Sequence, residues 1–316
     1  MGTTLYVGLD IGGTTVKVGA FSEAGERLGK LAVPTPPLVD EKGYGAVTDG
    51  ISQLAASLEV VADDVRGIGL AVPAPVPADG NVQIVANMDL DLLGLKDALE
   101  AAFAGATVAY VNDANAAALG ELWQGGACGL KSCVLITLGT GVGGGVVVDG
   151  KVVAGANGAA GEIGHITVNP AEPLECGCGR HGCLEQYTSA KGMVRVYREE
   201  CARLGTEPVA LSGDTDTLSL FDAYKAGDEA AKAAVSLMCD RLGLALSIVS
   251  GVTDPERFVI GGGVAGGFDL FKDELAERYR HYVLGCCADT PIVVAELGND
   301  AGIYGAAYEG LLAAQA

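Results

Sequence analysis

The chain has 316 residues, of which 49% are hydrophobic, and 40 acidic against 20 basic residues give it a formal net charge of −20. This length allows two domains, each with a substantial buried core. The negative charge opposes binding to nucleic acid or to an anionic membrane surface, although backbone N–H groups and a metal ion can still bind a small phosphate.

The first predicted elements form a hairpin. Leu5–Leu9 is a short apolar run and Thr14–Phe21 alternates apolar and polar residues, so we expect two strands with Gly12 and Gly13 at the bend. Pro and Gly residues predict a loop over residues 33–45. The next elements are predicted to be a helix, two strands and a second helix, over Ala46–Leu58, Arg66–Val72, Thr107–Val111 and Ala114–Trp123.

A second hairpin repeats the first. A strand predicted over Ser132–Thr137 leads into the glycine-rich segment Gly139–Gly145, and strands over Val146–Val148 and Lys151–Ala154 follow. The order of strand, glycine-rich bend and strand therefore occurs twice. This repetition suggests a duplicated fold with a phosphate-binding loop in each half.

The C-terminal part of the chain is predicted to alternate helices and strands. Asp228–Ser250 reads as a long helix with Asp228 as its N-cap and Gly251 as its stop. The elements after it are a strand, a helix, a strand and a helix, over Arg257–Ile260, Phe268–Tyr282, Pro291–Ala295 and Ala301–Leu312. Such alternation is typical of an α/β chain.

Three glycine-rich bends can bring the backbone close to an anion, at Gly12–Thr15, Gly139–Gly145 and Gly261–Gly263. None has the Gly-Lys-Ser/Thr ending of a Walker loop, and none opens a dinucleotide-binding unit. One such bend alone is explained as well by an ordinary tight turn. Three together favour a nucleotide ligand, since hydroxyl groups accompany two of them, on Thr14, Thr15 and Thr140.

Asp113 lies where a predicted strand gives way to a helix. In α/β folds this position projects a side chain into a cleft, and the helix N-terminus favours a charged carboxylate. The alternative is that Asp113 only caps the helix. Its neighbours Asn112 and Asn115 add polarity that a cap does not need.

Four residues have the ligand types of a closed zinc site: His165, Cys176, Cys178 and Cys183. The glycines among them let three thiolates converge on one ion. Buried free thiols or a redox pair are the alternatives, and His181 is a competing ligand.

Glu162 and Glu185 flank this cysteine segment and stand among glycine and apolar residues. Most glutamates are solvated surface groups, which is the alternative for both. Their place beside metal ligands favours hydrogen bonding to a polyol instead.

The nine cysteines are an odd number in a chain without a recognisable signal peptide. A secreted disulfide framework is therefore not expected, and the cytoplasm is the predicted location. No stretch of 18 or more apolar residues predicts a membrane span.

The chain resembles the ROK family of bacterial sugar kinases and regulators over nearly its whole length. The matching segments are Asp10-Ile-Gly-Gly-Thr-Thr15, Asn112-Asp-Ala-Asn115, Leu138-Gly-Thr-Gly-Val-Gly143, Gly161-Glu-Ile-Gly-His165, the cysteine segment Cys176–Glu185, Gly261–Gly263 and Ala301–Ala306. The segment Leu184-Glu-Gln-Tyr-Thr-Ser-Ala190 is most similar to the glucokinase branch.

The resemblance implies an actin-like, ribonuclease-H-like ATPase fold with two α/β domains around a cleft. We expect a smaller domain over residues 1–115 together with the C-terminal helix 302–316, and a larger domain over residues 116–301. It also implies a homodimer or a dimer of dimers.

The resemblance further implies transfer of a phosphoryl group from ATP to a hexose, with glucose to glucose 6-phosphate as the first expectation. Asp113 is then the general base, and the sugar is held by Asn87, Asn112, Asp113, Glu162, His165 and Glu185. Mg²⁺-ATP is held by Asp10, Gly12, Gly13, Thr14, Thr15, Gly139, Thr140, Gly141, Gly143, Gly261, Gly262 and Gly263, and the Zn²⁺ of the cysteine segment is structural.

Two segments depart from the family pattern near the expected sugar site. Ala74 and Pro77 replace residues of a Pro-Gly-Pro-Val-Asp turn, and the segment after Asn87 reads Met-Asp-Leu-Asp91. The departures leave fructose, mannose or an N-acylhexosamine open as substrates, and polyphosphate open as the donor. A non-catalytic sugar sensor or a DNA-binding regulator is disfavoured, because the loops and Asp113 are intact and no winged-helix segment precedes Asp10.

Overall fold

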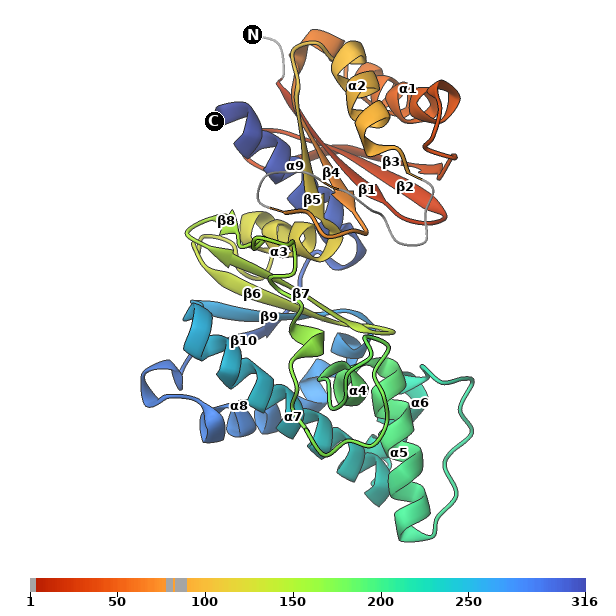
Figure 1. Ribbon diagram of the computed structural model, residues 1–316, viewed down its shortest axis with the longest axis vertical. Coiled ribbons are helices and arrows are strands. Elements are labelled where there is room, and N and C mark those ends of the chain that lie inside the picture. Colours follow the sequence, from red (N-terminus) through yellow and green to blue (C-terminus); the bar gives the residue numbers. More distant parts are fainter. Residues whose placement is uncertain (1–3, 78–81, 83–89) are drawn as a thin grey trace. The chain divides into compact units, whose positions relative to one another are not determined.

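The computed structural model describes residues 4–77, 82 and 90–316. The chain folds into two compact units (Figure 1). The first comprises residues 1–132, 145–161 and 296–316, and the second comprises residues 133–144 and 162–295. Both contain helices and strands, as the sequence predicts.

The first sheet has the strand order β3-β2-β1-β4-β5. Its strands are β1 (Leu5–Ile11), β2 (Thr15–Phe21), β3 (Arg27–Pro34), β4 (Val65–Val72) and β5 (Thr107–Asn112). β1 and β2 form the predicted antiparallel hairpin, and β4 and β5 run parallel to β1. β3 was not predicted as a strand, because its exposed residues alternate with half-buried ones at the edge of the sheet and carry little apolar signal.

Helices cover both faces of this sheet (Figure 1). Leu5, Val7 and Leu9 point to a core that includes residues of α1 (Glu41–Ser57) and α2 (Leu92–Ala102). On the opposite face α9 (Ala301–Gln315) lies against the backbone itself. A Cβ at Gly8 would stand 1.9 Å from Ile303 O, so only glycine permits this close packing.

The helix α3 (Asp113–Gln124) packs on α9 in the same manner. A Cβ at Gly305 would lie 1.6 Å from Ala116 O, and one at Gly120 would lie 2.4 Å from Ala301 O. The whole of α3 therefore groups with the first unit. The division expected after residue 115 differs from this grouping, because it would separate α3 from the helix on which it packs.

The second sheet has the order β10-β9-β6-β7-β8. Its strands are β6 (Cys133–Leu138), β7 (Val142–Val148), β8 (Lys151–Val152), β9 (Arg257–Gly261) and β10 (Ile292–Val294). The helices of the second unit are α4 (Glu185–Thr188), α5 (Ala190–Leu204), α6 (Thr217–Lys225), α7 (Glu229–Thr253) and α8 (Phe268–Tyr282). Short 3₁₀ turns are η1 (Ala62–Asp64), η2 (Ile163–His165), η3 (Gly263–Gly267), η4 (Gly285–Cys287) and η5 (Gly298–Asp300).

The long helix α7 confirms one predicted end and corrects the other. The Asp228 side chain accepts from Ala231 N at 2.8 Å, as an N-cap does. The predicted stop at Gly251 is wrong, because the helix continues to Thr253 and ends at Asp254 with a left-handed φ of 42°. In the described part of the chain α7 is the one helix long and apolar enough to cross a membrane. Half of its apolar stretch is buried inside the unit, so this is weak evidence for a span.

Candidate functional site

Asp10 lies in β1 just before the β1–β2 turn, and a lysine fixes its side chain. Asp10 Oδ2 forms an ion pair with Lys17 Nζ at 2.9 Å, and the same Nζ donates to Asn299 O at 2.8 Å. Asp10 and Lys17 face each other across the hairpin. The ammonium therefore orients the carboxylate and balances its charge.

The β1–β2 turn itself is closed by backbone bonds. Gly12 N donates to Thr15 O at 3.1 Å, and Thr35 binds the turn through its hydroxyl on Gly12 O at 2.6 Å and its N–H on Thr14 O at 3.1 Å. Gly13 and Thr14 are exposed, and nothing lies within 4 Å of the Cβ position of Gly13. The tip of the turn is thus open to an anion.

Asp113 is the first residue of α3, and Asn112 is its N-cap. Asn112 Oδ1 accepts from Ala114 N at 3.0 Å and from Asn115 N at 3.2 Å. The Asn112 amide also donates to Ala74 O at 3.2 Å and to Asp113 Oδ1 at 3.0 Å. Asp113 Oδ1 also accepts from Ala114 N at 2.8 Å, but the cap of α3 is Asn112, and the exposed Asp113 carboxylate lies in the favourable field of the helix N-terminus.

Asp10 and Asp113 lie along one edge of the first sheet. The parallel strands β1, β4 and β5 have their carboxyl ends at this edge, with Asp10 beside Ala71 and Ala71 beside Val111. Two strand spacings separate β1 from β5, or about 10 Å. The carboxylates of Asp10 and Asp113 therefore belong to the same edge of the sheet, the edge at which α/β sheets bind ligands.

The four predicted metal ligands converge in the second unit. The ligand atoms of His165, Cys176, Cys178 and Cys183 all lie within 4.8 Å of one another. His165 Nδ1 is 3.9 Å from Cys176 Sγ, and Cys178 Sγ is 3.6 Å from Cys183 Sγ. Three sulfurs and one imidazole nitrogen at these separations fit a tetrahedral zinc ion. His181 is exposed and lies outside the cluster.

The thiols of this cluster differ in acidity. Hydrogen bonds from the backbone and side chain of Arg180 lower the pKa of Cys178 to about 6. Burial raises the pKa of Cys183 to about 12. One sulfur is therefore ready to bind as a thiolate, whereas the buried one needs a cation beside it to lose its proton.

Glu185 connects the metal cluster to the β6–β7 turn. Its Oε2 accepts from Val142 N at 2.9 Å, and its Oε1 lies 4.0 Å from Cys176 Sγ. A Cβ at Gly141 would stand 2.5 Å from Oε2, so the turn needs glycine there. Glu162 is exposed and immediately precedes η2. Its carbonyl oxygen accepts a hydrogen bond from His165 N at 3.1 Å.

Two of the three glycine bends meet in the second unit. The turn with Gly139, Thr140, Gly141 and Gly143 follows β6, and Gly261–Gly263 follows β9, which pairs with β6. Gly262 has a φ of 85°, and a Cβ there would lie 2.4 Å from Leu138 O. Parallel pairing thus sets two open glycine segments side by side.

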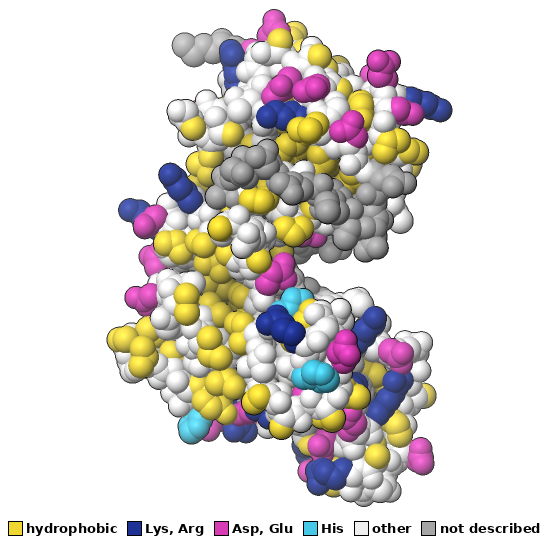
Figure 2. Space-filling view, in the orientation of Figure 1, with side chains coloured by type: hydrophobic (Ala, Val, Ile, Leu, Met, Phe, Trp, Pro, Cys, Tyr) yellow, Lys and Arg dark blue, Asp and Glu magenta, His cyan; other side chains and the backbone are white. Residues whose placement is uncertain are grey.

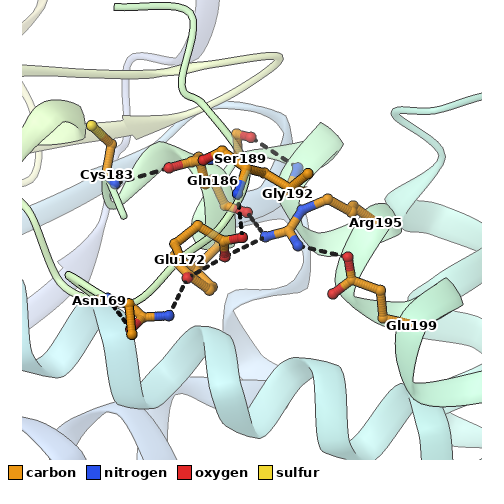
Figure 3. Close-up of polar contacts among 11 residues, drawn as sticks. Asn169, Glu172, Cys183, Gln186, Ser189, Gly192, Arg195 and Glu199 are labelled. Atoms are coloured by element: carbon orange, nitrogen blue, oxygen red, sulfur yellow. Dashed lines mark hydrogen bonds and ion pairs between the residues drawn. The ribbon is translucent and has the colours of Figure 1, made fainter. Parts of the chain in front are cut away.

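Side chains of α4 bond to the cysteine segment and to the residues before it (Figure 3). Gln186 accepts from Cys183 N at 3.0 Å and donates to Leu174 O at 2.9 Å. The Tyr187 hydroxyl donates to the buried Glu172 at 2.5 Å, while Asn169 donates to that hydroxyl at 2.7 Å. Hydrogen bonds from Tyr187 and the Leu174 backbone lower the pKa of Glu172, although its burial opposes this.

The predicted site residues divide between the two units. Asp10, Gly12–Thr15, Asn112 and Asp113 belong to the first, and the residues from Gly139 onward belong to the second. Asn87 lies outside the described residues. Sequence reasoning missed Lys17 and the Glu172–Tyr187 anchor. Lys17 had a usable signal, since pairing the predicted hairpin strands sets it opposite Asp10.

Known proteins resemble this chain over nearly its whole length. The family model described as ROK family matches residues 6–313. A glucokinase of Halalkalibacterium halodurans is 38% identical, over 95% of this chain and 93% of its own length. An N-acetyl-D-glucosamine kinase of Vibrio atlanticus is 32% identical, over 96% of this chain and 99% of its own.

Solved structures agree with the sequence relatives. The ROK hexokinase of Thermus thermophilus has a TM-score of 0.81 at 33% identity, and the two chains cover 99% of each other. A ROK family glucokinase of Streptomyces griseus, solved with glucose and AMPPNP, has a TM-score of 0.70 at 32% identity, with 99% of this chain and 100% of that chain covered. The predicted actin-like ATPase fold is confirmed.

Proposed function

Because the chain belongs to the ROK family, we propose that it transfers a phosphoryl group from ATP to a hexose, with glucose to glucose 6-phosphate as the preferred reaction. The observation that carries the proposal is the edge of the first sheet. There Asp113 presents an exposed carboxylate at a helix N-terminus, and Asp10 stands beside an open glycine turn.

Asp113 is proposed to be the general base. Its carboxylate would accept a hydrogen bond from the 6-hydroxyl of the sugar and take the proton as the oxygen bonds to phosphorus. Asn112 caps α3, so the backbone that carries the Asp113 side chain is held in place. A strongly raised pKa is not required, because the hydroxyl becomes acidic late in a loose transition state.

Asp10 and the glycine segments fit Mg²⁺-ATP by their chemistry. Carboxylate oxygen is a ligand that Mg²⁺ prefers, and exposed turn N–H groups suit phosphate oxygens. Bound Mg²⁺-ATP would supply the transferred phosphoryl group and the charge that offsets its oxygens. Lys17 would keep the Asp10 carboxylate oriented toward the turn.

Glu162, His165 and Glu185 are proposed to bind the sugar hydroxyls together with Asn112, Asn87 and Asp113. Since His165 Nδ1 faces the sulfurs, its Nε2 is left for the substrate. Zinc would then be structural, held by His165, Cys176, Cys178 and Cys183, and would fix the imidazole that reads the sugar. Closure of the two domains around the substrates is part of the proposal.

The choice of hexose rests on the segment that departs from the family. Ala74 is buried, its carbonyl accepts from Asn112, and Gly158 packs on the neighbouring Pro75. The residue that carries the additional methyl is thus bonded through its carbonyl to a proposed sugar ligand. An N-acylhexosamine remains the second candidate, because kinases for N-acetyl-D-glucosamine are 32% identical over the same span.

ATP is preferred to polyphosphate as the donor. Lys and Arg side chains are scattered among acidic and neutral ones on the face shown in Figure 2, instead of lining one groove, which a long polyanion would need. The proposal also includes cytoplasmic location and assembly as a homodimer or a dimer of dimers.

A coupled assay of ADP release over glucose, fructose, mannose, N-acetylglucosamine and N-acetylmannosamine tests the proposal. Each sugar is measured with ATP as the donor. Reactions with polyphosphate as the donor release no ADP, so the sugar phosphate formed is measured directly. We expect glucose with ATP to give the highest kcat/KM. Turnover of another hexose alone would replace the substrate, and no turnover with any sugar would refute the kinase.

A further inference from the structure

Cys286 and Cys287 form a pair of neighbouring thiols that the proposed reaction does not use. They lie in η4, after α8, with their Sγ atoms 3.6 Å apart. This equals the separation of Cys178 and Cys183 within the metal cluster. Successive side chains of an extended chain point to opposite faces, so the 3₁₀ turn is what brings both sulfurs to one side.

Hydrogen bonds fix the turn that carries the two thiols. Cys287 N donates to Leu284 O at 2.9 Å, and Cys287 O accepts from Thr290 N at 3.1 Å and from the Tyr279 hydroxyl at 2.9 Å. Tyr279 is itself buried and bonded to Ser250 at 2.7 Å. The thiols are therefore held in place before any ligand arrives, which lowers the entropic cost of binding.

One thiol is accessible and the other is backed by a carboxylate. Cys286 is exposed, whereas Cys287 is 6% exposed and its Sγ lies 3.4 Å from Asp254 Oδ1. Nothing lies within 4 Å of the Cβ position of Gly285, so the approach from solvent is open. Among the described residues only the cluster of His165 and the three cysteines gathers three or more close metal ligands. The Cys286–Cys287 pair therefore offers two sulfurs, not a complete zinc site.

The geometry favours a bridging atom over a direct disulfide. A disulfide needs an S–S distance of about 2.05 Å and a Cα–Cα distance of roughly 4.4–6.8 Å, yet consecutive Cα atoms are only about 3.8 Å apart. One central atom with two bonds to sulfur of about 2.3 Å spans the observed separation at an angle of roughly 100°. No movement of the turn is then required.

We propose that Cys286 and Cys287 form a dithiol site for thiophilic ions or compounds that bond two sulfurs, such as trivalent arsenicals or a soft cation like Cd²⁺. With an aryl arsenic(III) oxide, two As–S bonds form and the As–O bonding is lost. The oxygen leaves as water with the two thiol protons, and arsenic stays trivalent. The hydrogen bond from Cys286 raises the pKa of Cys287 to about 11, so the Cys287 thiol carries its proton at neutral pH.

The test uses the zinc-loaded full-length protein and phenylarsine oxide, followed by peptide mapping by mass spectrometry. We expect one arsenical bridging the peptide with Cys286 and Cys287. Two tethered thiols bind roughly 100-fold or more tighter than one, so C286S should lose the adduct at low reagent. C128S, which removes a lone exposed thiol, should keep it.

A second arm titrates Cd²⁺ and follows sulfur-to-cadmium charge-transfer absorbance in the wild type and in C286S. If C286S binds both phenylarsine oxide and Cd²⁺ more weakly than the wild type, the site accepts both ligands. If C286S binds only one of them more weakly, the site is specific for that ligand. The proposal is overturned if C286S matches the wild type with both probes, and an arsenical that maps only to the peptide of Cys176–Cys183 counts as no difference with that probe. Sugar phosphorylation is not measured, so failure here is independent of the proposed kinase.

Discussion

Both glycine-rich hairpin turns follow a strand, but a different carboxylate stands at each, with a different partner. At the β1–β2 turn the carboxylate belongs to the strand itself, since Asp10 precedes the turn and Lys17 neutralises it. At the β6–β7 turn the carboxylate comes from far along the chain, and Glu185 occupies the N–H of Val142. At the first turn the carboxylate is bonded to a lysine side chain, whereas at the second turn one backbone N–H is bonded to a carboxylate and is unavailable to a phosphate.

This difference assigns distinct tasks to the carboxylates of the two units. Those of the first unit, Asp10 and Asp113, stand at a sheet edge where they can meet a metal ion and a reacting hydroxyl. Glu185 of the second unit shares its oxygens between a turn and the metal cluster. Removing charge at each position should thus change a different kinetic quantity.

Replacing Asp113 by Asn should have the largest effect. The amide cannot take the proton, so kcat should fall on the order of 10²-fold or more, with little change in the KM for glucose. The melting temperature should fall only slightly, because Asn112 supplies the cap and only the favourable charge at the helix N-terminus is lost. Steady-state kinetics and thermal unfolding measure both quantities. D97N on α2 removes the same charge at an exposed position and should keep full activity. Parental turnover in D113N would rule out the general base.

Replacing Asp10 by Asn should reduce kcat/KM for ATP by roughly 10²-fold and raise the Mg²⁺ concentration needed for half-maximal rate. A neutral amide is a weaker ligand for Mg²⁺ than a carboxylate, and Lys17 loses its partner. Glucose affinity, measured by calorimetry without nucleotide, should be unchanged. An unaltered Mg²⁺ requirement would mean that the first turn holds no cation.

Replacing Glu185 by Gln should act on the sugar instead. The amide oxygen can still accept from Val142 N, so the turn is preserved and the KM for ATP should change little. A hydrogen bond to a charged group contributes about 1.5–3 kcal/mol, so the KM for glucose should rise roughly 10- to 100-fold. A larger change in the KM for ATP than in that for glucose would show that Glu185 serves the turn alone.

Most of the fold could be predicted from the sequence where the pattern was local. The alternation in β2, the apolar run of β1 and the Asp228 cap all gave the observed elements, because period and capping depend on neighbouring residues. β3 and the end of α7 could not be predicted. An edge strand owes its structure to pairing with β2, and Gly251 is tolerated inside α7, which continues to Thr253.

The candidate site was predictable in part for the same reason. His165 and the three cysteines carry ligand chemistry in their own side chains, and the structure gathers all four. The bond from Val142 N to Glu185 and the Glu172–Tyr187 contact join residues far apart in the chain. Such pairings have no local pattern, so only the folded backbone reveals them.

The smallest effect is expected for Tyr187→Phe. This variant tests whether the cysteine segment is held by the hydrogen bonds of Tyr187 as well as by the proposed zinc ion. The variant removes the hydroxyl between Asn169 and Glu172 and leaves the four ligands intact. Outer groups of this kind typically change metal affinity 10- to 100-fold, and we expect roughly the lower value. Zinc release to a chromogenic chelator should accelerate about 10-fold, with a modest rise in the KM for glucose. Y224F removes a hydroxyl that donates to Leu270 O and serves as the matched control. Equal zinc release from both variants would mean that the ligands alone hold the segment.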